Sequence, residues 1–306
     1  MIVEIGGFVA GLVLLLVGAD RTIDAAAEMA LYYGISAFLI GVTVVSIGTS
    51  IPEMTTSVYA ARYGAGDLLV GNIVGSETAQ ITLAIGVVAL ISPIEAARRN
   101  VLVYGGAMVL AMVIMILVLE DGEIIRSEGF LMMLAYVAFI HDLYSNEGGE
   151  EVTREVADEQ LSLRQAVPRI GAGIALVVAG GHLMVTNGVA VARLVGVPEF
   201  LVGLLTGLGT TAPEIAVAGL AARRGEAGIS VGALLGSNIT DPVFSLGIGA
   251  LAADVAVTDP RGVFAATGYM LFVSLVVLGI MYWQRGIGRR MAAVCLLLYF
   301  PSFLLS

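Results

Sequence analysis

Two matching stretches decide the fold of this chain: Gly48-Thr49-Ser50-Ile51-Pro52-Glu53 and Gly209-Thr210-Thr211-Ala212-Pro213-Glu214. Each is followed at the same distance by a second polar cluster, Gly75-Ser76-Glu77-Thr78-Ala79-Gln80 and Gly236-Ser237-Asn238-Ile239-Thr240-Asp241. The offset is 161 residues throughout (53 to 214, 76 to 237, 80 to 241). The surroundings are apolar, where a carboxylate is costly. Broken helices at matching places in two halves mark the binding site of secondary transporters. The pattern therefore predicts a cation transporter with a symmetric site at mid-membrane.

The composition places the chain in a membrane. Of its 306 residues, 58% are hydrophobic and 13% are charged, with a mean hydropathy of +0.96, whereas soluble domains carry about 25% charged residues. Residues 100–119 and 262–284 contain no charge, and roughly 20 such residues make a spanning helix. The single cysteine, Cys295, excludes an internal disulfide. No basic patch is present to neutralise phosphates, so nucleic-acid binding is not expected.

Hydrophobic runs predict an all-α integral membrane protein with ten transmembrane helices. The longest polar stretch divides five spans from five, and an odd number per half forces the second half to enter from the opposite side. We therefore expect two inverted five-helix repeats, 1–144 and 167–306, joined by an acidic cytoplasmic loop, 145–166. The predicted spans are 3–19, 34–61, 68–91, 100–119, 127–143, 168–187, 197–222, 228–252, 262–283 and 288–305.

Arginine counts predict the orientation. With the N-terminus on one side, eleven arginines fall on the opposite side and four on the same side. Because positive residues are retained in the cytoplasm, both termini are expected outside the cell and the 145–166 loop inside, with the chain in the plasma membrane. The eleven are Arg21, Arg98, Arg99, Arg154, Arg164, Arg169, Arg223, Arg224, Arg285, Arg289 and Arg290; the four are Arg62, Arg126, Arg193 and Arg261.

The proline before each glutamate predicts a cation site. Pro52 and Pro213 have no N–H to donate, so a backbone carbonyl one turn earlier is freed. Such a carbonyl is tolerated at membrane depth only where it lines a site. Glu53 and Glu214 add charge, and neighbouring threonines and serines add hydroxyls. Carboxylate, carbonyl and hydroxyl oxygens suit hard cations such as calcium or sodium.

The second clusters extend this site. Ser76 and Gln80 are four residues apart and share a helix face, as do Ser237 and Asp241. Glycines in the same segments are expected to let helices approach closely. These are Gly71, Gly75, Gly232 and Gly236.

The pattern Gly-Thr-Ser-x-Pro-Glu followed by Gly-Asn-x-x-Gly-Ser, twice inverted, resembles the α-repeats of the cation/calcium exchanger superfamily, above all the prokaryotic sodium/calcium exchangers. This resemblance implies exchange of sodium for calcium by alternating access, with the first and sixth spans sliding as a pair. It implies Glu53 and Glu214 as central ligands and backbone oxygens from Thr49 and Thr210. The remaining implied ligands are Ser50, Ser76, Thr211 and Ser237 at flanking sodium sites, Gln80 and Asp241 at the centre, and the carbonyls of Ser46 and Gly207.

The first repeat departs from the family at two positions. Glu77 stands where the second half has Asn238, and Gln80 stands where the family often has Asn or Asp. Glu77 is one residue past Ser76 and so is turned by about 100° from the site face. Two interpretations remain open: a neutral acid packed on a neighbouring helix, or an extra charge at the site.

The sequence is also compatible with functions other than sodium/calcium antiport. The same scaffold could exchange a divalent cation for protons, which Glu77 supports. Gly64-Ala65-Gly66-Asp67 matches a motif of intramembrane aspartyl proteases, but Asp67 falls in a loop. A passive channel would not need a duplicated, closed site. We therefore expect a transporter that is not an enzyme, with calcium and sodium as cargo, the bilayer as surroundings, no resident cofactor and no protein partner. His182 in the sixth span is expected to be a packing residue.

Overall fold

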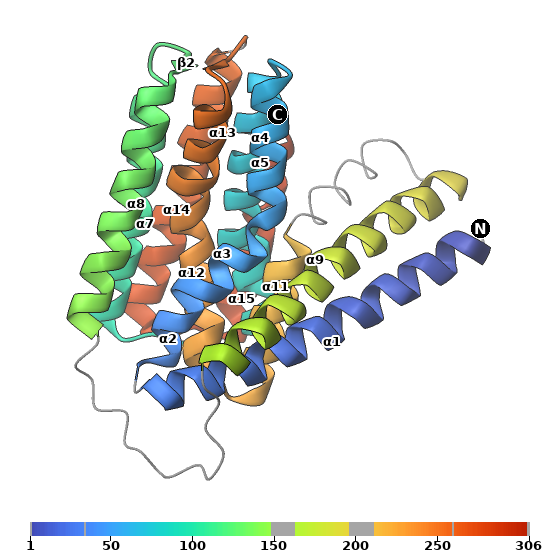
Figure 1. Ribbon diagram of the computed structural model, residues 1–306. Coiled ribbons are helices and arrows are strands. Elements are labelled where there is room, and N and C mark those ends of the chain that lie inside the picture. The colour runs from blue at the N-terminus through green and yellow to red at the C-terminus, as the bar shows by residue number, and fades with distance from the viewer. Residues whose placement is uncertain (1, 34, 148–162, 196–210, 259, 305–306) are drawn as a thin grey trace.

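The computed structural model describes residues 2–33, 35–147, 163–195, 211–258 and 260–304, which are almost entirely helical (Figure 1). The first half contains α1 (Ile2–Tyr33), α2 (Ala37–Ile40), the π-helical turn η1 (Gly41–Val45), α3 (Ser46–Thr49), α4 (Ile51–Arg62), α5 (Gly66–Ala79), the π-helical turn η2 (Gln80–Ala84), α6 (Ile85–Ile91), β1 (Ile94–Glu95), α7 (Arg98–Val118), β2 (Glu123–Ile124) and α8 (Arg126–Glu147). The second half contains α9 (Leu163–Leu194), α11 (Ala212–Arg224), α12 (Ala227–Thr240), the π-helical turn η3 (Asp241–Ser245), α13 (Leu246–Ala252), β3 (Val255–Ala256), α14 (Pro260–Gln284), β4 (Gly286–Ile287), α15 (Arg289–Leu297) and the 3₁₀ turn η4 (Phe300–Leu304).

These elements fall into ten consecutive groups across the described ranges, and the predicted ten-helix inverted repeat is confirmed. Judged by length and apolarity alone, five described helices could span a membrane, or six if the bent pair Ala37–Thr49 and Ile51–Arg62 is one span. The other groups fall short for local reasons. The α12–α13 group carries the polar residues Asn238 and Asp241, and α15 has only nine residues.

Two small sheets reveal the symmetry of the halves. β1 pairs with β4 in antiparallel fashion, and β2 pairs with β3. β1 follows the third span of the first half and β3 follows the third span of the second, while β2 and β4 each follow the fourth. Exchanging the two halves therefore converts one sheet into the other. Each sheet joins both halves at one end of the bundle, as inverted repeats require.

The helices of the bundle carry one buried stripe each. In α7 the buried residues Val101, Tyr104, Met108, Met112 and Met115 recur every three or four positions. This spacing places them on one helical face. Leucines on the opposite face of α7 are exposed, as expected for a helix whose other side meets lipid. α14 has the same arrangement and packs against α7.

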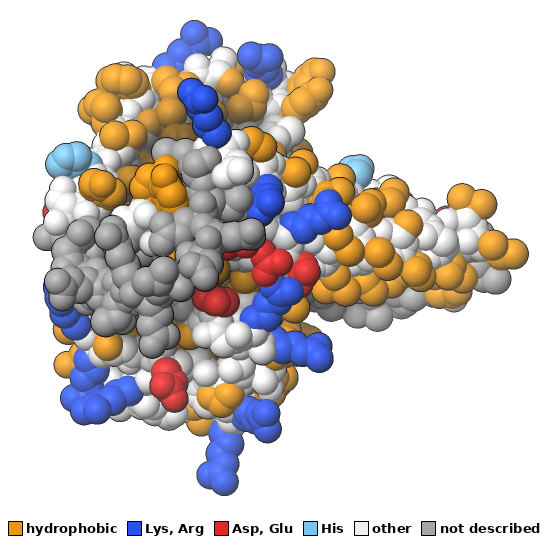
Figure 2. Space-filling model, turned by 60° about the horizontal axis from the view of Figure 1, so that its bottom comes forward, with side chains coloured by type: hydrophobic (Ala, Val, Ile, Leu, Met, Phe, Trp, Pro, Cys, Tyr) orange, Lys and Arg blue, Asp and Glu red, His pale blue; other side chains and the backbone are white. Residues whose placement is uncertain are grey.

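α1 and α9 form an antiparallel pair that projects obliquely from the bundle (Figures 1 and 2), and we call this pair the arm. Their backbones touch, because a Cβ on Gly11 would lie 2.4 Å from the Met184 nitrogen and one on Gly180 would lie 2.4 Å from the Leu15 nitrogen. Glycine at these positions permits the close approach. Figure 2 shows hydrophobic side chains over the surface of the arm.

Both arm helices are longer than predicted. α1 runs to Tyr33, although the first apolar run ends at Asp20, and α9 spans Leu163–Leu194 instead of 168–187. The extension of α1 is packed, since Ile23, Ala26 and Met29 are buried. Tertiary packing, which hydropathy does not report, therefore continues the helix past its charged residues.

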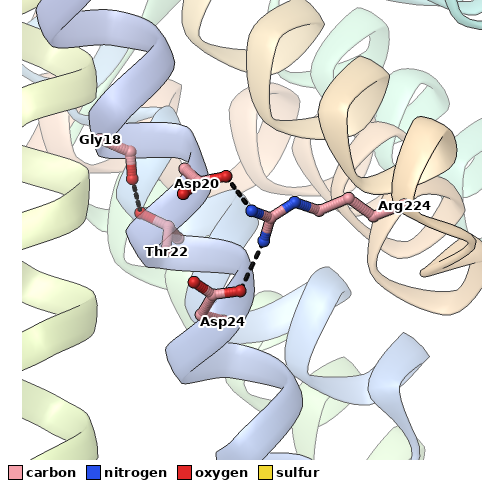
Figure 3. A network of polar contacts seen from close by, with 5 residues as sticks. All are labelled: Gly18, Asp20, Thr22, Asp24 and Arg224. Atoms are coloured by element: carbon pink, nitrogen blue, oxygen red, sulfur yellow. Dashed lines mark hydrogen bonds and ion pairs between the residues drawn. The ribbon is translucent and has the colours of Figure 1, made fainter.

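An ion cluster ties the arm to the bundle. The guanidinium of Arg224, at the end of α11, donates to the carboxylates of Asp20 and Asp24 on α1 (Figure 3). Between them on the helix, the Thr22 hydroxyl donates to the Gly18 carbonyl at 2.8 Å. A second pair, Arg169 and Glu28 at 3.5 Å, joins α9 to α1 within the arm.

Candidate functional site

The second span is broken at the first glutamate. Its two parts are bent by 45°, and Ser50 at the break has non-helical torsions (φ −78°, ψ 5°). Pro52 then occupies the first turn of α4, where its missing N–H is tolerated. Glu53 follows in that first turn and is fully buried. The N-terminus of a helix stabilises negative charge, so the break both exposes backbone oxygens and supports the carboxylate.

A chain of hydrogen bonds connects the clusters of both halves. Ser76 Oγ donates to Glu53 Oε1 at 3.1 Å, and Gln80 Nε2 lies 3.2 Å from Ser76 Oγ. The same Gln80 nitrogen donates to Asp241 Oδ2 at 3.1 Å, and Ser245 Oγ donates to Asp241 Oδ1 at 2.8 Å. All five residues are buried. The structure thus brings together the predicted residues Glu53, Ser76, Gln80 and Asp241.

The second half presents polar groups that the described residues do not satisfy. Glu214, in the first turn of α11 directly after Pro213, is fully buried. Neither of its oxygens, nor the Ser237 or Thr211 hydroxyl, has a hydrogen-bond partner among the described residues. In the first half the equivalent Ser76 and Glu53 are bonded. Buried polar groups normally find partners, so this side of the site has oxygens available to a cation. Thr210 and Gly207 lie outside the described residues.

The backbone is irregular beside the central residues. The π-helical turns η2 and η3 begin at Gln80 and Asp241, again 161 residues apart. Single π-turns inside α-helices are rare and occur mostly at functional sites. In both copies of the site, the π-turn therefore interrupts the regular hydrogen-bond pattern of the α-helix backbone.

The predicted hydroxyl and carbonyl ligands of the first half are all buried, but they differ in availability. The Ser50 hydroxyl has no partner among the described residues. The Ser46 carbonyl accepts from the Ser50 N–H at 3.0 Å and from the Thr49 hydroxyl at 3.3 Å. Coordination by the Ser46 carbonyl therefore requires the Thr49 side chain to turn away from it.

A polar group from α8 joins the site without having been predicted. Tyr136 Oη lies 3.0 Å from Thr240 Oγ1, which lies 3.4 Å from Ser46 Oγ. Here α12 meets α2, η1 and α3 closely, because a Cβ on Gly236 would lie 2.7 Å from Val42. The predicted close approach is seen at Gly232 and Gly236. A Cβ added to Gly71 or Gly75, in contrast, would meet no described atom within 4 Å. The segment equivalent to α2–α3 in the second half falls in residues 196–210.

The remaining sequence candidates lie as follows. Glu77 is fully buried, lies close enough to Asp241 and Glu214 to interact with them electrostatically, and has no hydrogen-bond partner for either carboxylate oxygen among the described residues. His182 is exposed on α9, and the expectation that it packs inside the protein is wrong. Asp67 was expected in a loop, but it lies in the first turn of α5, where its carboxylate accepts a hydrogen bond from the Thr258 N–H at 2.9 Å.

The site holds buried acidic side chains without a buried basic partner among the described residues. Glu53, Glu214 and Asp241 are buried and lie close enough to interact electrostatically. No arginine or histidine is buried among the described residues. No three carboxylate, imidazole or thiol side chains of the described chain are grouped as a metal site. A bound cation would therefore take part of its coordination from hydroxyl, amide and backbone oxygens, as sodium and calcium do.

Comparison with known proteins identifies relatives of this chain in both sequence and structure. The sequence model of the family described as sodium/calcium exchanger protein matches residues 3–141 and 167–306. The inner membrane protein YrbG of Escherichia coli is 34% identical over 90% of this chain and 88% of its own length. The sodium/calcium exchanger MaX1 of Methanosarcina acetivorans is 29% identical over 96% of this chain and 95% of its own. A solved structure of the sodium-calcium exchanger NCX_Mj covers 99% of this chain and 98% of its own, with 27% identity and a TM-score of 0.81.

Proposed function

We propose, from the premise that this chain belongs to the sodium/calcium exchanger protein family, that it is a secondary active antiporter exchanging sodium for calcium across a membrane. The transported ions bind at the buried site, with Glu53 and Glu214 as the central charged ligands. We further propose that the chain moves ions without catalysing a chemical reaction and needs no resident cofactor.

The observation that carries this proposal is the buried acidic cluster. Four acidic side chains from the two repeats, Glu53, Glu77, Glu214 and Asp241, lie inside an apolar bundle, with no buried basic residue among the described parts of the chain. Isolated buried charges are strongly destabilising and are retained where they bind something. Cations that enter the site neutralise it, and the unpartnered oxygens of Glu214 and the Ser237 hydroxyl are free to coordinate them.

The same charge explains why transport takes the form of exchange. With its carboxylates ionised, an empty site would place several negative charges in a low-dielectric interior, which disfavours movement of the site without cargo. Calcium and sodium compete for the same oxygens, so one must leave before the other binds. We propose that the arm of α1 and α9 moves across the bundle to open the site alternately to each side.

The flanking ligands follow the symmetry of the repeats. We propose Ser50, Ser76, Thr211 and Ser237 for the sodium positions beside the centre, with Gln80 and Asp241 between them. Backbone oxygens of Thr49, Thr210, Ser46 and Gly207 would complete the coordination. The bonds of Ser76 to Glu53 and of Gln80 to Asp241 support this grouping.

We also propose an orientation in the plasma membrane. The end of the bundle with the β1–β4 sheet gathers arginines from both halves, and Arg98 donates to the Tyr282 carbonyl there at 3.1 Å. Arginine side chains are visible on this face in Figure 2. Positive-inside logic assigns this face to the cytoplasm, with residues 145–166 as a cytoplasmic loop between repeats 1–144 and 167–306, and with both termini outside.

The test is uptake of radioactive calcium into proteoliposomes that contain the purified chain. Vesicles loaded with sodium should take up calcium, and vesicles loaded with potassium or choline should not. Vesicles loaded with acid and no sodium test protons as the counter-ion. If acid-loaded vesicles without sodium take up as much calcium as sodium-loaded vesicles, protons replace sodium as the counter-ion in the proposal. If calcium enters with no counter-ion and the uptake is accompanied by a current, the protein is a channel and not an exchanger.

A further inference from the structure

A groove lies where the arm meets the bundle. It has a volume of about 430 Å³ and lies between α1, α9 and α11, with Ile91 of α6 at one side. Among the described residues that line it, every side chain except that of Arg223 is apolar, or absent at Gly219. Figure 1 shows α11 at the place where the arm joins the bundle.

Several residues that line the groove are exposed at the surface of the protein. Leu12, Leu16 and Ile91, which line it, are exposed by 37%, 45% and 45%. In a chain that spans a membrane, exposed aliphatic side chains at this depth face the hydrocarbon of the bilayer. The buried acids at the centre are not among the residues that line the groove. Its natural occupant is therefore a hydrocarbon chain.

Arg223 supplies the one charge among the described residues of this lining. Its neighbour Arg224 donates to Asp20 and Asp24, whereas no carboxylate among the described residues forms an ion pair with Arg223. Arg223 is exposed in the last turn of α11 and belongs to the arginine-rich end of the bundle. A guanidinium beside an apolar groove complements an amphiphile with a negative head, since arginine binds phosphate oxygens strongly and basic pockets between helices hold lipid head groups.

We propose that this groove binds one anionic phospholipid, with an acyl chain along α1 and α11 and its phosphate on Arg223. This lipid touches the arm on one side and the bundle on the other. When the arm moves, the walls of the groove move apart or together, so a bound lipid biases that motion. Lipid binding rests on the membrane fold and is independent of which ions are transported, whereas its effect on the arm rests on the motion proposed above.

The test is lipid binding to the delipidated full chain by native mass spectrometry, without sodium or calcium. The tightest site should prefer phosphatidylglycerol over phosphatidylcholine. Arg223→Gln should weaken phosphatidylglycerol binding about fivefold, the equivalent of one basic residue at an anionic lipid, while phosphatidylcholine binding stays unchanged. Ala216→Leu, which fills the groove, should weaken both. The matched control is Arg62→Gln, since Arg62 is the counterpart of Arg223 at the other end of the bundle.

Other outcomes overturn the proposal. Equal affinity of the wild type for the two lipids would remove the role of charge, and equal losses in Arg223→Gln and Arg62→Gln would remove the role of the groove. If Arg223→Gln does not fold, as judged by size-exclusion chromatography, Arg223→Lys provides the second variant. It keeps the charge and should retain the preference for phosphatidylglycerol, and loss of that preference in a folded Arg223→Lys protein would contradict the proposal.

Discussion

Gln80 donates a hydrogen bond to Asp241 at 3.1 Å, and the two residues are counterparts in the two repeats. A residue that bonds to its own symmetry partner lies at the axis that relates the halves. Both side chains are buried, and each begins a π-helical turn. The pair is chemically unequal, with an amide on one side and a carboxylate on the other. The two residues at the axis therefore contribute one carboxylate, where strict symmetry would give two or none.

Removing that single charge should weaken calcium binding. Asp241→Asn keeps oxygen and nitrogen atoms in place for Gln80 and Ser245 but eliminates one negative charge. Because calcium affinity depends on the number of charged ligands, we expect calcium affinity to fall by at least about tenfold, with sodium affinity affected less. Isothermal titration of both ions measures this. Ser245→Ala, which removes only a hydrogen bond to Asp241, is the control and should have a smaller effect.

Acid should inhibit transport. Protons and cations compete for Glu53, Glu214 and Asp241, and coordination of a hard cation requires ionised carboxylates. The apparent calcium affinity should therefore fall as pH decreases and reach a plateau at higher pH where the carboxylates are ionised. Calcium uptake measured over a pH series in sodium-loaded vesicles tests this. An affinity that does not change through the acidic range would show that these carboxylates are not the ligands.

The ion cluster at Arg224 should control the position of the arm. Each exposed ion pair contributes about 0.2–1 kcal/mol, so loss of the two pairs with Asp20 and Asp24 changes the ratio of arm positions by roughly two- to thirtyfold. Arg224→Gln should therefore alter the exchange rate and the accessibility of engineered cysteines, with little change in ion affinity.

The matched control for Arg224 is Arg169→Gln. This change removes an ion pair with Glu28 that lies within the arm and does not bridge to the bundle. It should leave the accessibility pattern as in the wild type. Equal effects of the two variants would indicate a general loss of stability and not a contact specific to one arm position.

Glu77 should tune transport and not create it. Its helical position turns it away from Ser76 and Gln80, and the second half has Asn238 in its place. Glu77→Asn should therefore leave sodium-dependent calcium flux largely intact. The reciprocal variant Asn238→Glu tests whether an acid at this position changes ion preference. Loss of sodium coupling in a folded Glu77→Asn protein would instead favour protons as the counter-ion.

The sequence predicted which polar residues come together better than it predicted their surroundings. The repeated Pro-Glu and Gly-Ser clusters indicated Glu53, Ser76, Gln80 and Asp241, which the structure joins by hydrogen bonds, because polar residues stand out against a hydrocarbon background. The i, i+4 spacing of Ser245 after Asp241 also indicates a shared helix face, and Ser245 could have been predicted as a partner of Asp241 from this spacing. The equivalence of the halves followed from the constant offset alone.

Contacts between distant segments were not predictable in the same way. Hydropathy ended the first span at Asp20, since it cannot report that Arg224, 204 residues later, neutralises that carboxylate. Tyr136 resembles any aromatic residue of an apolar helix, and only the fold reveals its contact with Thr240. The unequal hydrogen bonding of Glu53 and Glu214 accompanies a difference between the repeats, since Gln80 donates to Ser76 whereas its counterpart Asp241 has no side-chain N–H to donate to Ser237.

The central claim is that Glu53 and Glu214 hold the transported ions. The most direct measurement compares calcium uptake into sodium-loaded proteoliposomes for the wild type, Glu53→Gln and Glu214→Gln at equal amounts of folded protein. Each substitution removes one charge while preserving shape, and calcium needs dense negative charge to offset its dehydration. We predict sodium-dependent uptake by the wild type and none by either variant. Wild-type calcium flux in either variant would contradict the assignment of the site.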